Sequence, residues 1–501
     1  MSHFRYVYAW LLLSAFAILV PAAVRADAPP LRQLPEFSSV NGVLNATFDL
    51  KPQTIDLGDG VSFEGYTYNG EYAGPVLRVH PGDVMHIKLT NNISDMTNLH
   101  FHGLHTSPLE NGDNIYIQVK PGDSFDYEVK IAPTQSPGLY WYHPHIHGIS
   151  ERLVNGGLSG MLIVDGFEKQ FPEMDGIKVQ AMIVKEYAVE ETKNPAIARL
   201  HRLVQTINGQ LLSSISMHKG ETQLWQIANP GANDFFHLSL KGHTFRVVGR
   251  DGVSTNQETI ADRIDLGPAS RVEVLVDAGE QPGSYDLVSE QTPTGLGADK
   301  TDSRVLANVV VDGEGTSVPV SHLTSFPAKP DLTTQKITNY RTFAFTENAL
   351  KGEYYINGKL FDHERIDTRV PVGATEEWTI RNDSDDTHVF HIHQMHFQVV
   401  EINGKPQPFD GYLDTVRVPE RGEVRLLMPF TDPEMVGQFV YHCHVLEHED
   451  KGMMANIEVY DPKKENFFLG LLRNYVPQLR NAGRICGART LSFWDKLKTS
   501  Y

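Results

Sequence analysis

One stretch near the end of the chain, from Tyr441 to Met454, concentrates side chains that bind metal ions. It reads YHCHVLEHEDKGMM and contains Cys443, one of only two cysteines in the sequence. Histidines flank this cysteine on both sides, another follows five residues later, and a methionine follows ten residues later. A core strand gains no packing from such a series, whereas thiolate, imidazole and thioether groups all ligate transition metals. We therefore expect a metal site, completed by ligands from elsewhere in the chain.

Three further histidine clusters occur earlier in the sequence, in the segments HFHG, HPH and HVFHIH. A single His-x-His pair is a weak signal, because it more often forms the polar face of a strand. Four clusters, at the matching ends of two parts of the chain, are a strong signal for metal binding. The histidines concerned are His100, His102, His143, His145, His388, His391, His393, His442, His444 and His448.

Alternation along a β-strand explains why a cysteine stands between two histidines. Residues i and i+2 point to one face of a strand, and residue i+1 points to the other. His442 and His444 therefore point away from Cys443, so that one strand reaches two metal sites. A thiolate, two imidazoles and a distant thioether are typical of blue-copper electron-transfer centres, whereas zinc prefers a closed tetrahedral set. The copper set that we expect is Cys443, His388, His448 and Met453.

The other eight histidines come equally from the first and the last part of the sequence. The two parts must therefore meet, with a second metal site between them. Eight imidazoles are too many for one ion and suit three ions. The pattern predicts a cluster of metal ions at a contact between domains.

The segments HFHG, HPH, HVFHIH and HCHVLEHEDKGM resemble the four motifs of three-domain multicopper oxidases of the laccase type. The resemblance covers roughly residues 40–460 and implies four copper ions per chain, with no expected ligand missing. It implies that the type 1 copper is bound by His388, Cys443, His448 and Met453, and the type 2 copper by His100 and His391. The implied ligands of the type 3 pair are His102, His143, His145, His393, His442 and His444.

The same resemblance implies an enzyme that couples one-electron oxidation of four substrate equivalents to the reduction of dioxygen to water. A small reducing substrate docks near His448, and electrons leave through Cys443 toward His442 and His444. We expect phenols or aromatic amines as donors. The alternative is a metallo-oxidase of Cu(I), Fe(II) or Mn(II) in copper tolerance, although a methionine-rich insert typical of cuprous oxidases is missing. A non-enzymatic copper-binding or scaffold protein is a third interpretation.

Two acidic residues are candidates for proton delivery to dioxygen. Glu449 directly follows His448 and matches a family position implicated in that role; its alternative is a solvated loop carboxylate. Many relatives carry an acid nine residues after the second histidine of the first motif. Here Asn111 occupies that position and Asp113 follows two residues later. We expect Cys443, His448, Glu449 and Asp113 to be the catalytic residues.

The elements that must position these residues are short strands separated by glycine and proline, which is typical of β-sandwiches. An internal repeat sets their number, because an Asn-Gly pair followed by two apolar strands begins at Asn69, Asn208 and Asn357. The middle repeat has Ser239 and Val288 where the third has His393 and His442. We therefore expect an all-β fold of three consecutive cupredoxin-like Greek-key β-sandwich domains, the middle one metal-free.

The repeat and the composition divide the chain into five segments. Residues 1–26 read as a signal peptide, because an apolar run follows Arg5 and small residues precede the end of the segment. The domains are expected at 27–168, 169–325 and 326–462, and a short, basic, helical extension that packs across the acidic body is expected at 463–501. The extension contains Cys486, which we expect to be a free thiol. The mature protein is therefore expected to be exported, either periplasmic or secreted.

The overall charge limits the kind of partner. The 501 residues carry a formal net charge of −18, which argues against binding to nucleic acid through phosphate contacts. The expected partners are dioxygen and a small reducing substrate. Contact of the basic extension with a membrane is the less favoured alternative, and the sequence does not set an oligomeric state.

Overall fold

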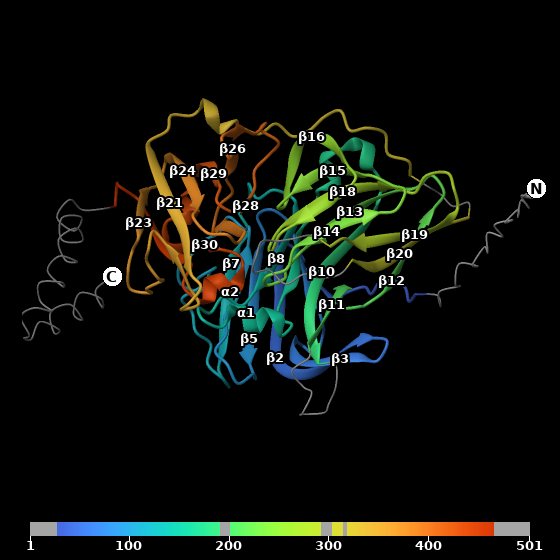
Figure 1. The fold of residues 1–501 in the computed structure, drawn as a ribbon, viewed down its shortest axis with the longest axis horizontal. Coiled ribbons are helices and arrows are strands. Elements are labelled where there is room, and N and C mark those ends of the chain that lie inside the picture. Colours follow the sequence, from blue (N-terminus) through green and yellow to red (C-terminus); the bar gives the residue numbers. More distant parts are fainter. Residues whose placement is uncertain (1–27, 191–200, 292–302, 314–317, 465–501) are drawn as a thin grey trace, which may run out of the picture.

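The computed structural model describes residues 28–190, 201–291, 303–313 and 318–464. These residues form an almost entirely β structure with six sheets, two in each of three consecutive sandwiches (Figure 1). The expected all-β, cupredoxin-like fold is confirmed. The expected signal peptide, the C-terminal extension and Cys486 lie outside the described residues. Among the helices of the described part, none is long and apolar enough to cross a membrane.

The first domain consists of a five-stranded and a four-stranded sheet. The five-stranded sheet has the order β1 (Glu36–Ser38), β4 (Gly74–Val79), β9 (Gly160–Val164), β8 (Gly138–His143) and β6 (His100–His102). The four-stranded sheet has the order β3 (Val61–Tyr68), β2 (Val43–Gly58), β5 (Val84–Asn91) and β7 (Ser124–Lys130). A short helix, α1 (Ser150–Asn155), connects β8 to β9.

The middle domain consists of a six-stranded and a five-stranded sheet. The first has the order β11 (His201–Ile207), β10 (Lys178–Glu190), β13 (Thr222–Ala228), β18 (Arg271–Asp277), β15 (Phe245–Arg250) and β16 (Val253–Ala261). The second has the order β12 (Ser213–His218), β20 (Arg304–Asp312), β19 (Gly283–Ser289), β14 (Phe236–Leu240) and β17 (Ile264–Leu266).

The third domain repeats this plan. One sheet has the order β22 (Glu353–Ile356), β21 (Asn339–Asn348), β24 (Ala374–Asn382), β29 (Glu423–Phe430), β26 (Gln398–Ile402) and β27 (Lys405–Pro406). The other has the order β23 (Thr368–Pro371), β31 (Met454–Tyr460), β30 (Gly437–Cys443), β25 (His388–Ile392) and β28 (Thr415–Val418). Helix α2 (Leu446–Asp450) follows β30, and the 3-10 turns are η1 (Glu168–Gln170), η2 (Pro172–Met174), η3 (Leu332–Thr334) and η4 (Pro433–Met435).

The Asn-Gly pairs occupy the same structural position in each domain. Asn69, Asn208 and Asn357 have φ values of 59°, 49° and 53°, and each is followed by a glycine that also has a positive φ. Both residues of such a turn must be left-handed, which explains the Asn-Gly sequence. The domain limits at 168 and 325 stay predictions; they fall between β9 and β10 and between β20 and β21.

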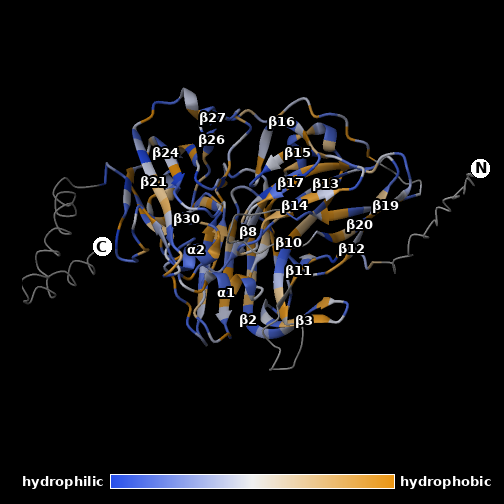
Figure 2. Ribbon diagram, in the orientation of Figure 1, coloured by the Kyte–Doolittle hydropathy of each residue, from blue (hydrophilic) through white to orange (hydrophobic). Residues whose placement is uncertain are grey.

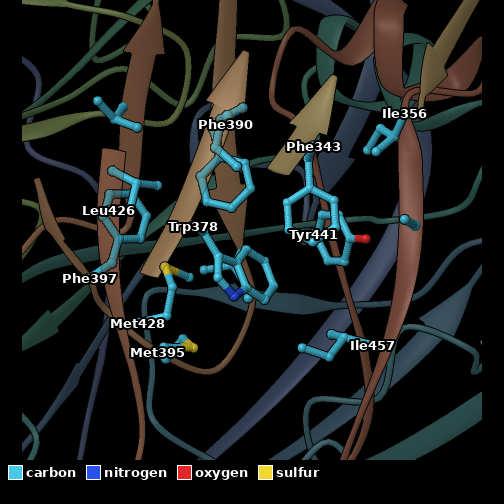
Figure 3. Packing of buried hydrophobic residues seen from close by; sticks show 14 of the residues in the cluster. Phe343, Ile356, Trp378, Phe390, Met395, Phe397, Leu426, Met428, Tyr441 and Ile457 are labelled. Atoms are coloured by element: carbon cyan, nitrogen blue, oxygen red, sulfur yellow. The ribbon is translucent and has the colours of Figure 1, made fainter. Parts of the chain in front are cut away.

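Alternating apolar residues build the cores between the paired sheets. In β5, Met85, Ile87 and Leu89 are fully buried while the residues between them are more exposed. Figure 2 shows hydrophobic residues gathered along the strands of the three domains. The third domain is packed around Trp378, whose ring lies beside those of Phe390 and Tyr441 (Figure 3). Strand β30 therefore has one face in this core, and the same face carries Cys443.

Candidate metal centre

Three predicted ligands from separate elements of the third domain converge on one point. Cys443 ends β30, His388 begins the neighbouring β25, and His448 lies on α2. The Cys443 Sγ atom lies 3.5 Å from Nδ1 of His388 and 3.7 Å from Nδ1 of His448, and the two nitrogens are 3.0 Å apart. All three side chains are buried. We name these three residues the cysteine cluster.

The surroundings leave the ligating atoms of the cysteine cluster free. The Ser384 hydroxyl donates to Oδ1 of Asn382 and therefore accepts a hydrogen bond from the Nε2–H group of His388 at 2.8 Å, which leaves the Nδ1 lone pair of His388 directed at Cys443. Burial lowers the pKa of His388 to about 3 and raises the pKa of the Cys443 thiol to about 12. A metal cation supplies the charge that a buried thiolate needs, so the pocket suits a thiolate-binding ion.

Met453 lies beside the cysteine cluster through backbone contacts. Its N–H donates to the carbonyl of His448 at 2.9 Å, and its carbonyl accepts from the N–H of Cys443 at 3.1 Å. The side chain is fully buried in the same apolar cluster as Cys443. The structure therefore places the backbone of Met453 beside Cys443 and His448, and its side chain in the core that also contains Cys443.

The other eight predicted histidines form a single buried pocket between the first and third domains. Equivalent strand pairs deliver them, because His100 pairs with His143 across β6 and β8, and His391 pairs with His442 across β25 and β30. Rings from the two domains stack in pairs with centroids 3.8 Å apart, one pair being His100 with His393. The second stacked pair is His102 with His391, also at 3.8 Å. The expected contact between the first and third domains is therefore present. We name the eight histidines at this contact the histidine pocket.

The nitrogens of the histidine pocket suit metal ions. The Nε2 atom of His442 lies 3.3 Å from Nε2 of His145 and 3.2 Å from Nε2 of His393. Burial and the neighbouring imidazoles keep the pKa of five of these histidines well below the usual value, so their rings are neutral. Unpaired buried nitrogens are costly unless an ion fills the space between them. The nitrogens with no hydrogen-bond partner among the described residues are His100 Nε2, His102 Nε2, His143 Nε2, His145 Nδ1, His391 Nε2, His393 Nδ1 and both nitrogens of His444.

Both predicted acids lie against the histidine pocket. Asp113 is buried, with Oδ1 3.0 Å from Nδ1 of His100. Glu449 is fully buried on α2, with Oε2 3.1 Å from Nδ1 of His442 and 3.6 Å from Nε2 of His145. Burial acts to raise the pKa of Glu449, but His145 and His442 outweigh it, so that the pKa lies well below its usual value. The position of Glu449 is therefore not that of a solvated loop carboxylate.

Several residues around the two clusters escaped the sequence reasoning. Tyr354 in β22 stacks on His448 with ring centroids 4.1 Å apart and planes 18° apart. Arg271 of the middle domain is fully buried and binds Asp414 behind the histidine pocket. Single tyrosine, arginine and aspartate residues in loops and strands carry no spacing pattern, so only the fold reveals them.

Comparison with known proteins agrees with this architecture. Multicopper oxidase family models match residues 49–169, 175–313 and 327–463. The chain belongs to the multicopper oxidases, a family of copper-dependent oxidoreductases, and the resemblance seen in its sequence is confirmed. The family uses dioxygen and a reducing substrate, and the neutral, unpaired imidazoles of the histidine pocket fit the copper that this family binds.

Individual relatives carry different names. The multicopper oxidase Mco of Staphylococcus aureus is 27% identical over 411 residues, covering 78% of this chain and 83% of that protein. The laccase of Bacillus subtilis is 24% identical and covers 79% and 90%. The cell division protein FtsP of Escherichia coli is 25% identical and covers 78% and 84%. A solved multicopper oxidase of Campylobacter jejuni, described as a metallo-oxidase, is 28% identical with a TM-score of 0.75 and covers 87% and 96%.

Proposed function

We propose that the protein is a four-copper oxidase that couples one-electron oxidation of phenols or aromatic amines to the reduction of dioxygen to water. One observation carries the proposal: consecutive residues of one strand serve both clusters. Cys443 belongs to the cysteine cluster, while His442 and His444 belong to the histidine pocket. The covalent chain between them joins the cysteine cluster to the histidine pocket.

The proposed ligands are those that the family resemblance implies, and their side chains lie in the two clusters. Copper ions held there would supply one-electron redox chemistry at the cysteine cluster and dioxygen reduction at the histidine pocket. The proposed type 1 ligands are His388, Cys443, His448 and Met453. The proposed type 2 ligands are His100 and His391, and those of the type 3 pair are His102, His143, His145, His393, His442 and His444.

The protein's own residues perform the remaining tasks. Burial of both clusters excludes bulk water, which strengthens every charge interaction inside them. Glu449 holds its carboxylate at Nδ1 of His442, and Asp113 holds its carboxylate at Nδ1 of His100. Both acids are therefore placed to take up and release the protons that the formation of water consumes.

The donor class is proposed from the surface of the cysteine cluster. His448 is only 6% exposed, and the half-buried Tyr354 lies stacked on its ring. A flat aromatic donor can stack on an aromatic residue at this position, which favours phenols and aromatic amines.

Oxidation of Cu(I), Fe(II) or Mn(II) is the second candidate. The carboxylates of Glu447, Glu347 and Asp386 add to burial in raising the pKa of Tyr354 to about 12, so negative charge surrounds this ring. Such charge attracts cations. The Campylobacter protein described as a metallo-oxidase supports this candidate.

A copper-loading experiment tests both candidates. We expect about four coppers per chain, a strong blue thiolate absorption band, a type 2 signal in electron paramagnetic resonance (EPR), and oxygen uptake with a phenol. Oxygen uptake with Cu(I) alone would favour the metallo-oxidase. Blue protein that consumes no oxygen with either donor would leave the non-enzymatic copper-binding or scaffold role.

We also propose that residues 1–26 direct export and that the mature protein is periplasmic or secreted. Fractionation of cells that express the full chain, with mass determination of the mature N-terminus, tests this location. Uncleaved protein in the cytoplasm would contradict it.

A further inference from the structure

We propose that the metal-free middle domain positions a copper ligand of the third domain. Two residues of the middle domain, Arg271 and Asp251, hold the segment Asp414–Thr415 of the third domain, and the carbonyl group of Asp414 orients the ligand His391. The inference rests on the proposed function, because it takes His391 as a type 2 ligand. Both are positioning residues: Asp251 acts through this segment, while Arg271 holds the segment and also has a terminal nitrogen 3.3 Å from Nδ1 of His102.

Arg271 extends from β18 of the middle domain into contact with both other domains. Its two terminal nitrogens each donate to one oxygen of the Asp414 carboxylate at 2.7 Å. Its Nε atom donates to the carbonyl of Leu139 in the first domain at 3.2 Å. Arg271 and Asp414 are both fully buried, and a buried, bidentate pair of this kind fixes geometry as well as charge. The Asp414 side chain therefore depends on a residue of another domain.

Asp251, in the turn between β15 and β16, holds the backbone of the same segment. Its Oδ2 atom accepts from the N–H of Asp414 at 3.3 Å, and from the N–H and hydroxyl of Thr415 at 3.2 Å and 2.9 Å. Its Oδ1 atom accepts from the N–H of Arg271 at 3.0 Å. The middle domain thus holds Asp414 by its side chain and by its main chain.

The held segment acts directly on His391. The Nδ1–H group of His391 donates to the carbonyl of Asp414 at 2.7 Å, which leaves the Nε2 lone pair directed into the histidine pocket. His102 stacks on His391, and its Nδ1 atom lies 3.4 Å from Oδ2 of Asp414. A displaced Asp414 would therefore move ligands from two domains.

The equivalent ligand of the first domain is held differently. Nδ1 of His100 lies 3.0 Å from Oδ1 of Asp113, which belongs to the same domain. His391 has no such internal carboxylate at its Nδ1 atom among the described residues and uses the segment that the middle domain holds. This asymmetry gives the middle domain a role at a site to which it contributes no ligand.

The test compares Arg271→Met and Arg271→Lys with Arg246→Met in the copper-loaded protein. Arg246 is the matched control, because it is also a buried arginine of the middle domain and pairs with Glu258 and Asp277. Lysine keeps the charge of Arg271 but cannot span both oxygens of Asp414. The readouts are copper per chain, the type 2 EPR signal, the blue absorption band and the rate at which a chelator removes type 2 copper.

We expect a chelator to remove type 2 copper about 10- to 100-fold faster from both Arg271 variants, with an unchanged blue band. Arg246→Met should lose copper at the rate of the unchanged protein. Equal rates in all proteins, or equally fast loss from Arg246→Met, would overturn the proposal. If Arg271→Met does not fold, Arg271→Lys and Asp251→Asn decide by the same readouts. Absence of type 2 copper from the unchanged protein would instead contradict the proposed function.

Discussion

Cys443 and its two histidine neighbours serve different clusters although they are consecutive in sequence. The alternation of a strand separates them, since Cys443 faces the core of the third domain and the histidines face the first domain. The coupling between the sites therefore depends on the identity of one residue.

The change Cys443→Ser tests this dependence. We expect loss of the blue absorption band and a fall in oxygen uptake of more than about 100-fold. This fall is larger than that expected from replacing a residue that only hydrogen-bonds to a metal ligand. Copper in the histidine pocket should remain, because its ligands are untouched. Absorption and copper content are the measurements, and Cys486→Ser is the control that should keep the blue band. A blue Cys443→Ser protein would contradict the ligand assignment.

Under the proposed function, Tyr354 is the residue on which an aromatic donor would stack beside His448. Replacement of Tyr354 by leucine removes the aromatic ring on which the donor would stack. Such a contact between rings is worth about 0.5–1.5 kcal/mol, so the KM for a phenol should rise about 2- to 10-fold. Tyr354→Phe keeps the ring and should leave KM nearly unchanged. Steady-state oxygen uptake measures this, and Tyr355→Leu in the same strand is the control. Similar KM values for Tyr354→Leu and the unchanged protein would exclude stacking at this residue.

At the scale of elements, three consecutive residues of α2 contact three different parts of the molecule. His448 contacts Cys443, Glu449 contacts the histidine pocket, and Asp450 contacts α1 of the first domain. Asp450 accepts from the N–H groups of Ser150 and Glu151 at 3.0 Å and 2.8 Å, and thus caps a helix of another domain. The two helices lie side by side at this junction (Figure 1).

The change Asp450→Ala should weaken this junction. Loss of a helix cap costs about 0.5–2 kcal/mol, so we expect a lower midpoint of thermal unfolding with an unchanged blue absorption band. Calorimetry of the copper-loaded protein measures the shift. Glu364→Ala, at a residue whose side chain is 78% exposed, is the control and should leave the midpoint unchanged. An equal midpoint in both variants would mean that Asp450 contributes nothing to docking.

At the scale of the whole molecule, buried polar groups cross each contact between domains. Lys185 of the middle domain is one of them, with Nζ donating to the carbonyl of Val154 at 2.6 Å and to the hydroxyl of Ser159 at 3.0 Å. Burial lowers the pKa of Lys185 to about 7 from its usual value of 10.5. Between these two values the unfolded chain binds more protons than the folded one, so stability rises with pH.

Denaturation at several pH values tests the contribution of Lys185. Between pH 7 and pH 9, Lys185 alone should add about 2 kcal/mol to the free energy of unfolding. Lys185→Met should lack this increment, so the difference between the variant and the unchanged protein should shrink or reverse across that range. Lys130→Met, at a residue with a 71% exposed side chain, is the control. Parallel pH profiles for all three proteins would contradict the lowered pKa.

The sequence was sufficient to predict the fold class and to indicate which histidines come together. Strand alternation and the spacing of histidines in four segments carry that information, as for His442 and His444. It was insufficient for Arg271, Asp414 and Tyr354, which are isolated in sequence and meet their partners only through domain docking. The environment of Glu449 likewise needed the structure, because an acidic run looks alike whether buried or solvated.

The two clusters differ in how many domains must be folded and in contact before a metal ion can bind. The cysteine cluster lies between β25, β30 and α2, so all of its residues come from the third domain. The histidine pocket has half of its ligands on the first domain and exists only after docking. Copper is therefore expected to bind first at the cysteine cluster and later at the histidine pocket. The early intermediate would hold a single copper ion, and its blue colour would report folding of the third domain before the protein can reduce dioxygen.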